Sequence, residues 1–471
     1  MLHSLLSYGD NLHYEKFADG SVKCIEDEVP FGLPDGWAWV RLGNLSAAIQ
    51  YGLSNSAEPQ GTHRLLRITD IQDGKVDWNA VPFTTVNDPE AYLLKTGDIV
   101  FARTGATVGK SFLITETPYP SVYASYLIRI RLLGSLSPEY IYQFFDSACY
   151  WSQITDKSVG VGQPNCNGTS LKELFIPLPP ISEQLRIVPT AQALLAYVAK
   201  IDAEKKSLLS IIMATKSKIL DLAIRGQLIP QDPNDEPASV LLERIRAEKE
   251  ELIKQGKIKR DKKESVIFRG EDNSYYLNNG QTTVDINDDL PFDIPDSWRW
   301  VRLKDVFIIN PRNKLDDDLD VSFIPMPLID DGYSGKHATD VRHWKEVKNG
   351  FTHFAEGDVG VAKITPCFEN RKSTVFENLT NGYGAGTTEL HVLRPFGNNI
   401  FVRYLLAYIK SDYFVEKGKQ TFTGDVGQQR ISKAYVENAY FPLPPVKEQE
   451  RIVQQIGIIF EFLNMITDAL S

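Results

Sequence analysis

Apolar and polar positions divide the chain into two similar blocks of short strands, separated and followed by longer helical stretches. Runs rich in β-branched residues and flanked by turn-forming residues predict strands. The clearest strands are expected at 65–71, 98–102, 126–132, 321–324, 360–364 and 390–393. Each block also contains one stretch with helical spacing, so we expect an amphipathic helix near 138–150 and another near 399–413.

Two longer helical stretches leave the ends of these blocks. In 182–226, two seven-residue tracks are broken by Lys205 and Asp202, and they predict an imperfect coiled-coil seam. The tracks consist of Ala191, Val198, Ile212 and Ile219, and of Val188, Leu195 and Leu209. Ser182 is the expected N-cap, and Pro189 should kink or restart the helix. At the chain end, steps of four and three connect Ile452, Ile456, Ile459, Leu463, Ile466 and Leu470.

A charged helix is also expected at 238–255, before Gly256 and the basic run 257–263. Because the two long helices leave equivalent positions, an antiparallel pair between them is favoured. The alternative is that each apolar stripe packs onto its own domain.

The chain contains one domain twice. VPFGLPDGWAWVRL (29–42) recurs as LPFDIPDSWRWVRL (290–303), and FIPLPPISEQLRIV (175–188) recurs as YFPLPPVKEQERIV (440–453). TGDIVFAR and EGDVGVAK, and VGQPN and VGQQR, match in the same order between these ends. The prolines after each last strand cannot lie in a helix or central strand, so they form rigid exits.

The predicted fold class is therefore α+β. Two similar, mostly-β domains are joined by long helices that form an antiparallel coiled coil. The predicted segments are an N-terminal partial repeat (1–28), the first domain (29–181), a central helical spacer (182–268), the second domain (269–446) and a C-terminal helix (447–471).

Composition narrows the function classes. The 471 residues are 42% hydrophobic and 24% charged, which is ordinary for a globular protein, and no apolar run is long enough for a membrane span. The four cysteines are scattered, and the start lacks an export signal, so we expect a cytoplasmic protein without disulfides or zinc. The net charge of −10 counts against a strongly basic nucleic-acid binder but allows a local patch.

Motifs for chemistry are incomplete. GATVGKS (105–111) has three residues between its glycines where a phosphate-binding loop needs four, and a strand-like SFLITETPYP follows it. Neither the N-P-P-[YF] nor the F-x-G-x-G motif of adenine methyltransferases is present, and His343 and His353 are too far apart for a helical zinc pair. We therefore predict no catalytic residue, no metal and no cofactor in this chain.

With the two PLPP-x-x-EQ-x-x-IV exits, the chain resembles the specificity subunits of Type I restriction-modification systems. The resemblance also rests on LLRITDIQDGKVDW (65–78), GDIVFARTGATVGK (97–110), AKITPCFENRK (362–372), GAGTTELHVLRP (384–395) and the linker 220–263. It implies two target-recognition domains, each binding one half of a bipartite site in double-stranded DNA. It also implies that the paired helices dock two modification subunits, which supply S-adenosylmethionine chemistry on adenine, and that a translocating restriction subunit can join.

The helical spacer fits this role by its length. At about 1.5 Å per residue, 182–226 spans roughly 65 Å, enough to separate two DNA readers by one helical turn or more. SYGDNLHYEKF (7–17) matches RGEDNSYYLNN (269–279), but nothing similar to 220–263 precedes it. On the resemblance, we expect one modification-subunit seat to be incomplete and assembly to be weaker or asymmetric.

Candidate base-contacting residues are long polar side chains on glycine-flanked loops, since Arg and Lys suit guanine and Asn and Gln suit adenine. In the first copy they are Arg64, Arg103, Thr104, Lys110, Gln163, Asn165 and Asn167. In the second copy they are Lys363, Thr365, Asn370, Arg371, Lys372, Thr387, Thr388, Gln428, Gln429 and Arg430. Some of these side chains would contact phosphates, Lys110 among them, and any one of them could instead be an ordinary solvated residue.

Three other functions stay open on sequence grounds. The chain could be a silent or recombining specificity cassette that assembles poorly, which neighbouring inverted gene copies would indicate. It could be a repeat scaffold that binds only protein. A fused restriction-methylation enzyme is disfavoured by the missing methyltransferase motifs, and S-adenosylmethionine binding by the isolated chain would revive that hypothesis.

Overall fold

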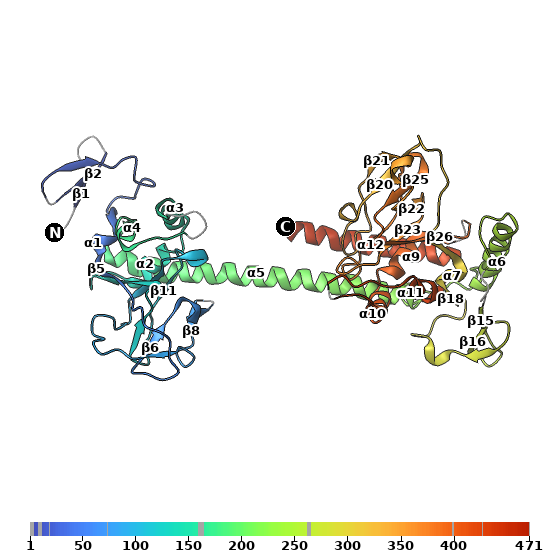
Figure 1. Ribbon diagram of the computed structural model, residues 1–471, viewed down its shortest axis with the longest axis horizontal. Coiled ribbons are helices and arrows are strands. Elements are labelled where there is room, and N and C mark those ends of the chain that lie inside the picture. Colours follow the sequence, from blue (N-terminus) through green and yellow to red (C-terminus); the bar gives the residue numbers. More distant parts are fainter. Residues whose placement is uncertain are drawn as a thin grey trace. The chain divides into compact units, whose positions relative to one another are not determined.

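The computed structural model describes residues 4–7, 12–17, 19–72, 74–158, 164–260, 265–397, 400–425 and 427–470. These residues form two compact units, Met1–Ile201 and Asp202–Ser471 (Figure 1). Each unit contains one copy of the repeat, and helix α5 (Ile181–Ile224) continues from the first unit into the second.

The central sheet of unit 1 has four antiparallel strands in the order β11-β10-β13-β5. They are β5 (Ser46–Tyr51), β10 (Ile99–Ala102), β11 (Ser111–Leu113) and β13 (Leu127–Leu132). Alternate residues of β10 enter two different cores: Ile99 and Phe101 pack on one side, Val100 and Ala102 on the other. This sheet is therefore buried on both faces, which explains why β10 is apolar throughout.

The second sheet of unit 1 is smaller and holds a parallel pair. Its order is β12-β6-β9, and a separate two-stranded ribbon follows it. The strands are β6 (His63–Leu66), β7 (Ile71–Gln72), β8 (Lys75–Val76), β9 (Phe83–Thr84) and β12 (Ser121–Tyr123). The single strand expected at 65–71 is wrong, because a 3₁₀ turn at Ile68–Asp70 interrupts it and the Asp70 carboxylate accepts the Arg67 N–H at 2.8 Å.

Unit 2 repeats the central sheet and enlarges the second one. The orders are β19-β26-β23-β24 and β21-β20-β25-β22, and β20 and β25 form the parallel pair. The strands are β19 (Phe307–Ile309), β20 (Asp320–Ile324), β21 (Asp340–His343), β22 (Thr352–Ala355), β23 (Val359–Ala362), β24 (Ser373–Val375), β25 (Tyr383–Gly386) and β26 (Leu390–Pro395). Short helix α8 (Trp344–Val347) follows β21.

Each copy has two short helices where the sequence predicted one. They are α2 (Pro138–Phe144) with α3 (Ala148–Lys157), and α9 (Val402–Ile409) with α10 (Asp412–Lys419). The prediction failed because Ser147 and Ser411 act as N-caps: their hydroxyls accept the Tyr150 and Phe414 N–H groups and begin a second helix. Each copy also has a further short helix before its last strand, α4 (Gly168–Lys172) in the first copy and α11 (Lys433–Asn438) in the second.

A two-stranded sheet closes each copy at the point where the long helix leaves. These sheets pair β4 (Ala38–Arg41) with β14 (Phe175–Leu178), and β18 (Arg299–Arg302) with β27 (Tyr440–Leu443). Pro177 and Pro442 are tolerated there because each strand has one partner only. One helical turn follows each first strand, α1 (Leu42–Leu45) and α7 (Leu303–Val306).

A three-stranded antiparallel meander precedes each copy, so the partial repeat seen at the start of the sequence has the same strand pattern as its counterpart. The strands are β1 (Ser4–Ser7), β2 (His13–Lys16) and β3 (Val22–Cys24), and β15 (Val266–Arg269), β16 (Tyr275–Asn278) and β17 (Thr283–Asp285). Helix α6 (Ala238–Lys254) lies before the second meander; Gln255 is its C-cap, and Gly256 follows with positive φ, close to the expected end.

Within unit 2, the end of α5 pairs with α12 (Val446–Leu470), as Figure 1 shows. Lys216 of α5 donates to Asn464 of α12 at 2.6 Å, whereas the last turn of α5 packs near Ile452, so the two helices run antiparallel. The buried positions Ile212, Lys216, Ile219 and Ala223 alternate steps of four and three. The predicted coiled coil is therefore present at the end of α5, whereas Leu195 and Val198 of the predicted tracks are 60% and 55% exposed.

Two expectations for α5 were wrong. The helix begins at Ile181, so Ser182 lies inside the first turn and is not the N-cap. The helix also does not restart at Pro189, which is contained in it. Beside the proline, the Thr190 hydroxyl donates to Arg186 O and the Gln143 amide donates to Val188 O. The kink that was the other expectation for Pro189 stays a prediction.

Candidate nucleic-acid interface

A buried ion pair holds the same two strands in each central sheet. Arg131 donates to Asp98 at 2.7 and 2.6 Å, and Arg394 donates to Asp358 at 2.8 and 2.7 Å. Each aspartate follows a glycine with positive φ, and each also accepts a backbone N–H three residues before it. The Gly-Asp pair in TGDIVFAR and EGDVGVAK therefore fixes the position at which β10 and β23 begin.

Three loops meet at the other end of these strands, in the same way in both copies. In unit 1, Arg103 N donates to Tyr126 O at 3.1 Å, and Cys166 N donates to Arg103 O at 3.0 Å. In unit 2, Lys363 N donates to Glu389 O at 3.0 Å, and Ile431 N donates to Lys363 O at 2.9 Å. Arg103, Tyr126 and Asn165 thus occupy the same places as Lys363, Glu389 and Arg430.

We call these two places the three-loop sites, defined by the residues just named and their immediate neighbours. Of the sequence candidates in unit 1, Arg103, Thr104 and Asn165 lie there, and Thr104 forms a β-bridge with Asn165. The Arg103 guanidinium lies 5.1 Å from the Tyr51 ring, and Tyr126 is 62% exposed at the same site. Gln163 lies outside the described residues.

The other candidates in unit 1 lie elsewhere or have structural partners. Lys110 is exposed, beyond the 3₁₀ turn Gly105–Thr107. Asn167 caps α4 by accepting Ser170 N–H at 2.9 Å. Arg64 is half-buried in the second sheet, where it donates to Val81 O at 2.5 Å and stacks 3.9 Å from the Phe83 ring.

In unit 2 the three-loop site contains more of the predicted residues. Thr365 N donates to Gln429 O at 2.9 Å, and Gln429 N donates to the Thr365 hydroxyl at 3.1 Å. Thr387 accepts Glu389 N–H at 3.1 Å, while Thr388 and Gln428 are exposed. The Arg430 guanidinium donates to the Glu389 carboxylate at 2.9 and 3.1 Å. This hydrogen bonding lowers the pKa of Glu389 and raises the pKa of Arg430.

Three predicted residues of unit 2 are held away from this site. Asn370 is exposed and uses its backbone carbonyl to accept Gly332 N–H at 2.8 Å. Arg371 donates to Lys410 O at 3.0 Å and pairs with Asp412 of α10. Lys372 donates to Ile329 O at 2.7 Å and pairs with Asp331 at 2.9 Å.

A depression of about 270 Å³ lies beside the unit 2 site and includes Lys363 and Thr388. Its other walls are Asn310–Arg312, Gly350–His353 and Leu390. Burial lowers the pKa of His353, so this ring is neutral at pH 7. His353 Nδ1 accepts Asn313 N–H at 3.3 Å, which leaves Nε2 to donate to Lys348 O at 2.9 Å.

Sequence reasoning missed Tyr126, Glu389 and the exposed Arg312 at the edge of this depression. Tyr126 and Glu389 each stand one residue before the matched strands β13 and β26, so aligning Leu127 with Leu390 would have found them. Arg312 follows β19, the counterpart of β5, and no signal in the sequence identifies it.

In the part of the chain that the structure describes, no three His, Cys, Asp or Glu side chains could hold a metal ion. Nor is any described helix long and apolar enough to cross a membrane. GATVGKS leads into strand β11, as expected, and not into a helix.

Two segments, residues 34–211 and 295–468, match the family model of the type I restriction modification DNA specificity domain. The chain belongs to this family. The two matched segments cover both three-loop sites and both exits, so the duplication in the sequence is a duplication of the specificity domain.

Relatives within this family include the EcoAI and EcoEI type I restriction enzyme specificity subunits of Escherichia coli, which are 48% and 45% identical over 243 residues. Each match covers 51% of this chain and 38% of that protein, so it spans less than half of these relatives. The putative MjaX specificity subunit of Methanocaldococcus jannaschii is 22% identical, over 92% of this chain and 89% of that protein.

Solved structures share the fold. An HsdS subunit from Thermoanaerobacter tengcongensis has a TM-score of 0.52 and 19% identity, covering 94% of this chain and 93% of its own. A chain from work on complex assembly and conformational transition of the type I R-M system has a TM-score of 0.55 and 19% identity, with 94% of each chain covered. The fold of this chain is therefore shared with solved structures.

Proposed function

We propose that this chain is the DNA-specificity subunit of a type I restriction-modification complex, with each three-loop site binding one half of a bipartite site. One observation carries the proposal. Two copies of a specificity domain hold their loops with the same backbone bonds but present different side chains there. The same backbone arrangement with different side chains at the loops suits two domains that bind different half-sites, because base edges are distinguished by side-chain chemistry.

The residues assigned to DNA contact are those of the three-loop sites. In unit 1 they are Arg103, Thr104, Tyr126 and Asn165, with Lys110 as a phosphate contact. In unit 2 they are Lys363, Thr365, Thr387, Thr388, Gln428, Gln429 and Arg430. We leave out Arg64, Asn167, Arg371 and Lys372, because each has a structural partner and none is one of the residues that define the three-loop sites. Arg430 is kept, although it pairs with Glu389, because it is one of those defining residues.

Chemistry on DNA belongs to partner subunits in this proposal. S-adenosylmethionine would bind to a modification subunit. A binding measurement should detect S-adenosylmethionine on that partner and not on this chain. Two modification subunits and a restriction subunit are the expected partners, and the cytoplasm is the expected location. The shared name of the family and its relatives supports this assignment.

Mapping methylated adenines in a genome that carries this chain and its partners tests the function. The expected result is one bipartite motif with a fixed gap. If Lys363 contacts a base edge, Lys363→Ala should relax one half of that motif and weaken binding by about 1–3 kcal/mol. If Lys363 contacts a phosphate, the variant should weaken binding to all sequences alike and leave the motif unchanged.

Arg103→Ala is the matched variant and should act on the other half. Lys257→Ala, an exposed lysine after α6, serves as the control and should leave the motif and affinity unchanged. Methylation without a fixed motif, or a motif and a binding affinity that are both unaffected by Lys363→Ala and by Arg103→Ala, would contradict the proposal.

A further inference from the structure

The depression of about 270 Å³ beside the three-loop site of unit 2 is cationic, although the chain as a whole has a net charge of −10. Lys363 and Arg312 both line it, together with the exposed Thr388. Among the described residues that line it, none is an aspartate or a glutamate. A cavity whose charged side chains all have the same sign attracts a ligand of the opposite charge, so the depression is a candidate anion site.

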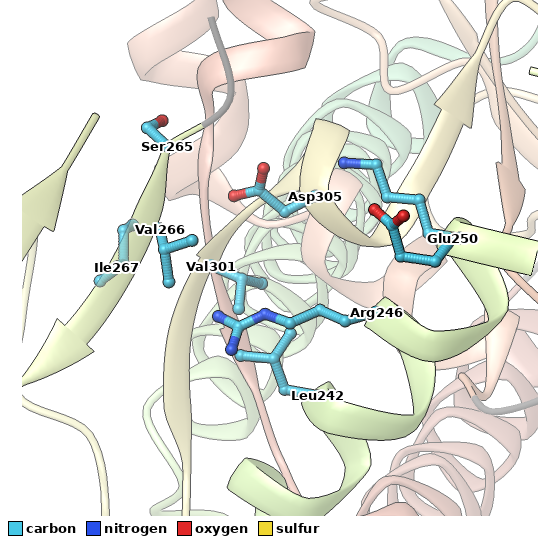
Figure 2. Close-up of a pocket in the computed structure, with 9 residues that line it drawn as sticks. Leu242, Arg246, Glu250, Ser265, Val266, Ile267, Val301 and Asp305 are labelled. Carbon is cyan, nitrogen blue, oxygen red and sulfur yellow. The ribbon is translucent and has the colours of Figure 1, made fainter. Parts of the chain in front are cut away.

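Other cavities of unit 2 combine cations with carboxylates. Figure 2 shows Asp305 and Glu250 around the same space as Arg246, in the pocket of about 310 Å³ between α6, β15 and α7. A larger cavity of about 870 Å³ between α5, α9 and α12 includes Asp331 and Glu461 beside its lysines. An anion in either cavity would face fixed negative charge, whereas an anion in the depression would not.

The carboxylate closest in sequence to the depression is already paired. Glu389 accepts the Arg430 guanidinium at 2.9 and 3.1 Å, and the pKa of Glu389 is lowered by this hydrogen bond and, to a lesser extent, by the Lys363 charge. The Lys363 ammonium makes no hydrogen bond or salt bridge to another described residue. The Arg312 guanidinium donates to a backbone carbonyl at 3.1 Å through one of its nitrogens. Lys363 and Arg312 therefore both keep N–H groups for a ligand.

The same depression suits a phosphate better than a base edge. The Asn310 amide oxygen already accepts Val392 N–H at 2.9 Å. Both ring nitrogens of His353 are also occupied, Nδ1 by Asn313 N–H and Nε2 by Lys348 O. Two like charges at one site repel each other, and an anion between them relieves that repulsion, whereas a neutral base does not. A phosphate diester supplies both the charge and acceptor oxygens for several donors.

Unit 1 is built differently at the equivalent place. The pairing of β5 with β13 and of β19 with β26 places Gly52 where unit 2 has Arg312. A Cβ atom at Gly52 would lie 2.3 Å from Tyr123 O, so the chain there leaves no room for an arginine. In unit 2, Asn310 has a positive φ of 56°, and the chain that follows it forms one wall of the depression. The arginine is therefore a feature of unit 2.

We propose that the depression binds one phosphate of the DNA backbone beside the half-site of unit 2, with Lys363 and Arg312 as its cationic contacts. This inference rests on the function proposed above, and it makes Lys363 a phosphate contact and not a base contact. A phosphate bound in this way fixes the register of the DNA on unit 2 without carrying sequence information. Base discrimination in unit 2 then belongs to the other residues of its three-loop site.

Methylphosphonate scanning tests the proposal, because this substitution removes the charge of one phosphate and changes no base. The chain in complex with its modification partners is titrated with duplexes that carry the mapped motif and one neutral linkage at each position in turn. One linkage in or beside the unit 2 half-site should weaken wild-type binding about tenfold. The same linkage should have no further effect on a variant carrying both Arg312→Ala and Lys363→Ala. Because only the DNA is altered, this coupling distinguishes a DNA phosphate from free phosphate.

Single variants supply a second measurement and a control. Arg312→Ala and Lys363→Ala should each weaken binding to cognate and unrelated duplexes alike, and each should reduce the slope of log affinity against log salt concentration by about one. Arg312→Lys, which keeps the charge, should retain most of the affinity. Lys314→Ala, an exposed position of the same loop outside the depression, should keep the full effect of the neutral linkage.

Two results overturn the proposal. The first is relaxed methylation at one position of the unit 2 half-site in Arg312→Ala or Lys363→Ala, because that residue would then contact a base. The second is a scan in which no neutral linkage is coupled to these two residues. Both results leave the proposed function intact, whereas a wild-type complex without sequence-dependent binding would contradict the proposed function itself.

Discussion

The two copies of the specificity domain share the contacts that stabilise their fold and differ in the side chains at their loops. The Asp–Arg pair under the central sheet, the bonds of Gln184 and Gln449 at the starts of α5 and α12, and a tryptophan–glutamate bond beside each glutamine occur in both, with nearly the same distances. At the loop tips, Arg103, Tyr126 and Asn165 stand where Lys363, Glu389 and Arg430 stand. The difference separates residues that build the frame from residues that can confer specificity.

The second sheet is shared by the two copies only in part. Its parallel pair is kept, but unit 1 has three strands there and unit 2 has four. Arg64 of β6 corresponds to Ser322 of β20, and each fixes its sheet in its own way: Arg64 donates to Val81 O, whereas Ser322 accepts Thr380 N–H at 2.9 Å. A frame element can therefore differ between the copies without belonging to the binding site.

The largest expected effect concerns the glutamines at the helix starts. Gln449→Ala should lower the free energy of unfolding of unit 2 by about 2–4 kcal/mol, because two buried bonds are lost and Phe401 N–H and Pro444 O are left unsatisfied. Gln184→Ala should have a similar effect on unit 1. Denaturant titration with hydrogen exchange would resolve the two units.

Gln454→Ala, at an exposed position of α12, is the control and should change stability little. If Gln184→Ala cost far less than Gln449→Ala, the two exits would not be equivalent in energy, and the shared geometry would overstate their likeness.

A smaller effect is expected for Arg64→Met. Loss of the bond to Val81 O and of the contact with Phe83 should destabilise unit 1 by about 1–3 kcal/mol. The methylated motif should stay the same, in contrast to Arg103→Ala. A changed half-site at unchanged stability would place Arg64 among the DNA contacts and contradict its assignment to the frame.

The smallest effect is a pH dependence limited to unit 2. Burial lowers the pKa of Lys410 to about 7, although its ammonium donates to Gly332 O at 2.6 Å and to Arg371 O at 2.8 Å. In the unfolded chain this lysine stays protonated to about pH 10.4, so between these two values the unfolded state binds more protons. The lysine should therefore make the free energy of unfolding rise with pH from about 7 upwards.

Lys410→Met should flatten that rise in unit 2 and leave unit 1 unaffected, as urea titrations at pH 7, 8 and 9 would reveal. An identical slope in wild type and variant would mean that Lys410 keeps an ordinary pKa in the folded protein.

The sequence predicted the duplication, the fold class and the antiparallel coiled coil, because matched motifs and a seven-residue period are long-range signals. It failed where a single polar contact decides the local structure. Ser147 and Ser411 divide expected helices, and Asp70 turns the chain inside an expected strand. Pro189 did not restart α5, and the helix continues through it from Ile181 to Ile224.

The candidate site was predictable in part for a related reason. Loop position identified Arg103, Lys363 and Arg430, but residue type alone cannot show which side chains have a partner, and Arg430 itself pairs with Glu389. Arg371 and Lys372 looked equivalent to Lys363 in the sequence, yet they bind Asp412 and Asp331. Whether any of them contacts DNA remains a prediction for the variants described above.

The glutamine bridges also define where one specificity domain could be cut out and grafted. A block from Trp37 to the helix start at Gln184 contains the bonds of Gln184 and the bond between Trp37 and Glu183. The block from Trp298 to Gln449 contains their counterparts, whereas Gln231, which donates to Glu448, lies outside it. Splice points placed in the first turns of α5 and α12 would preserve these anchors. Chimaeras made at these points should fold as their parents do, so that the half-sites become interchangeable parts.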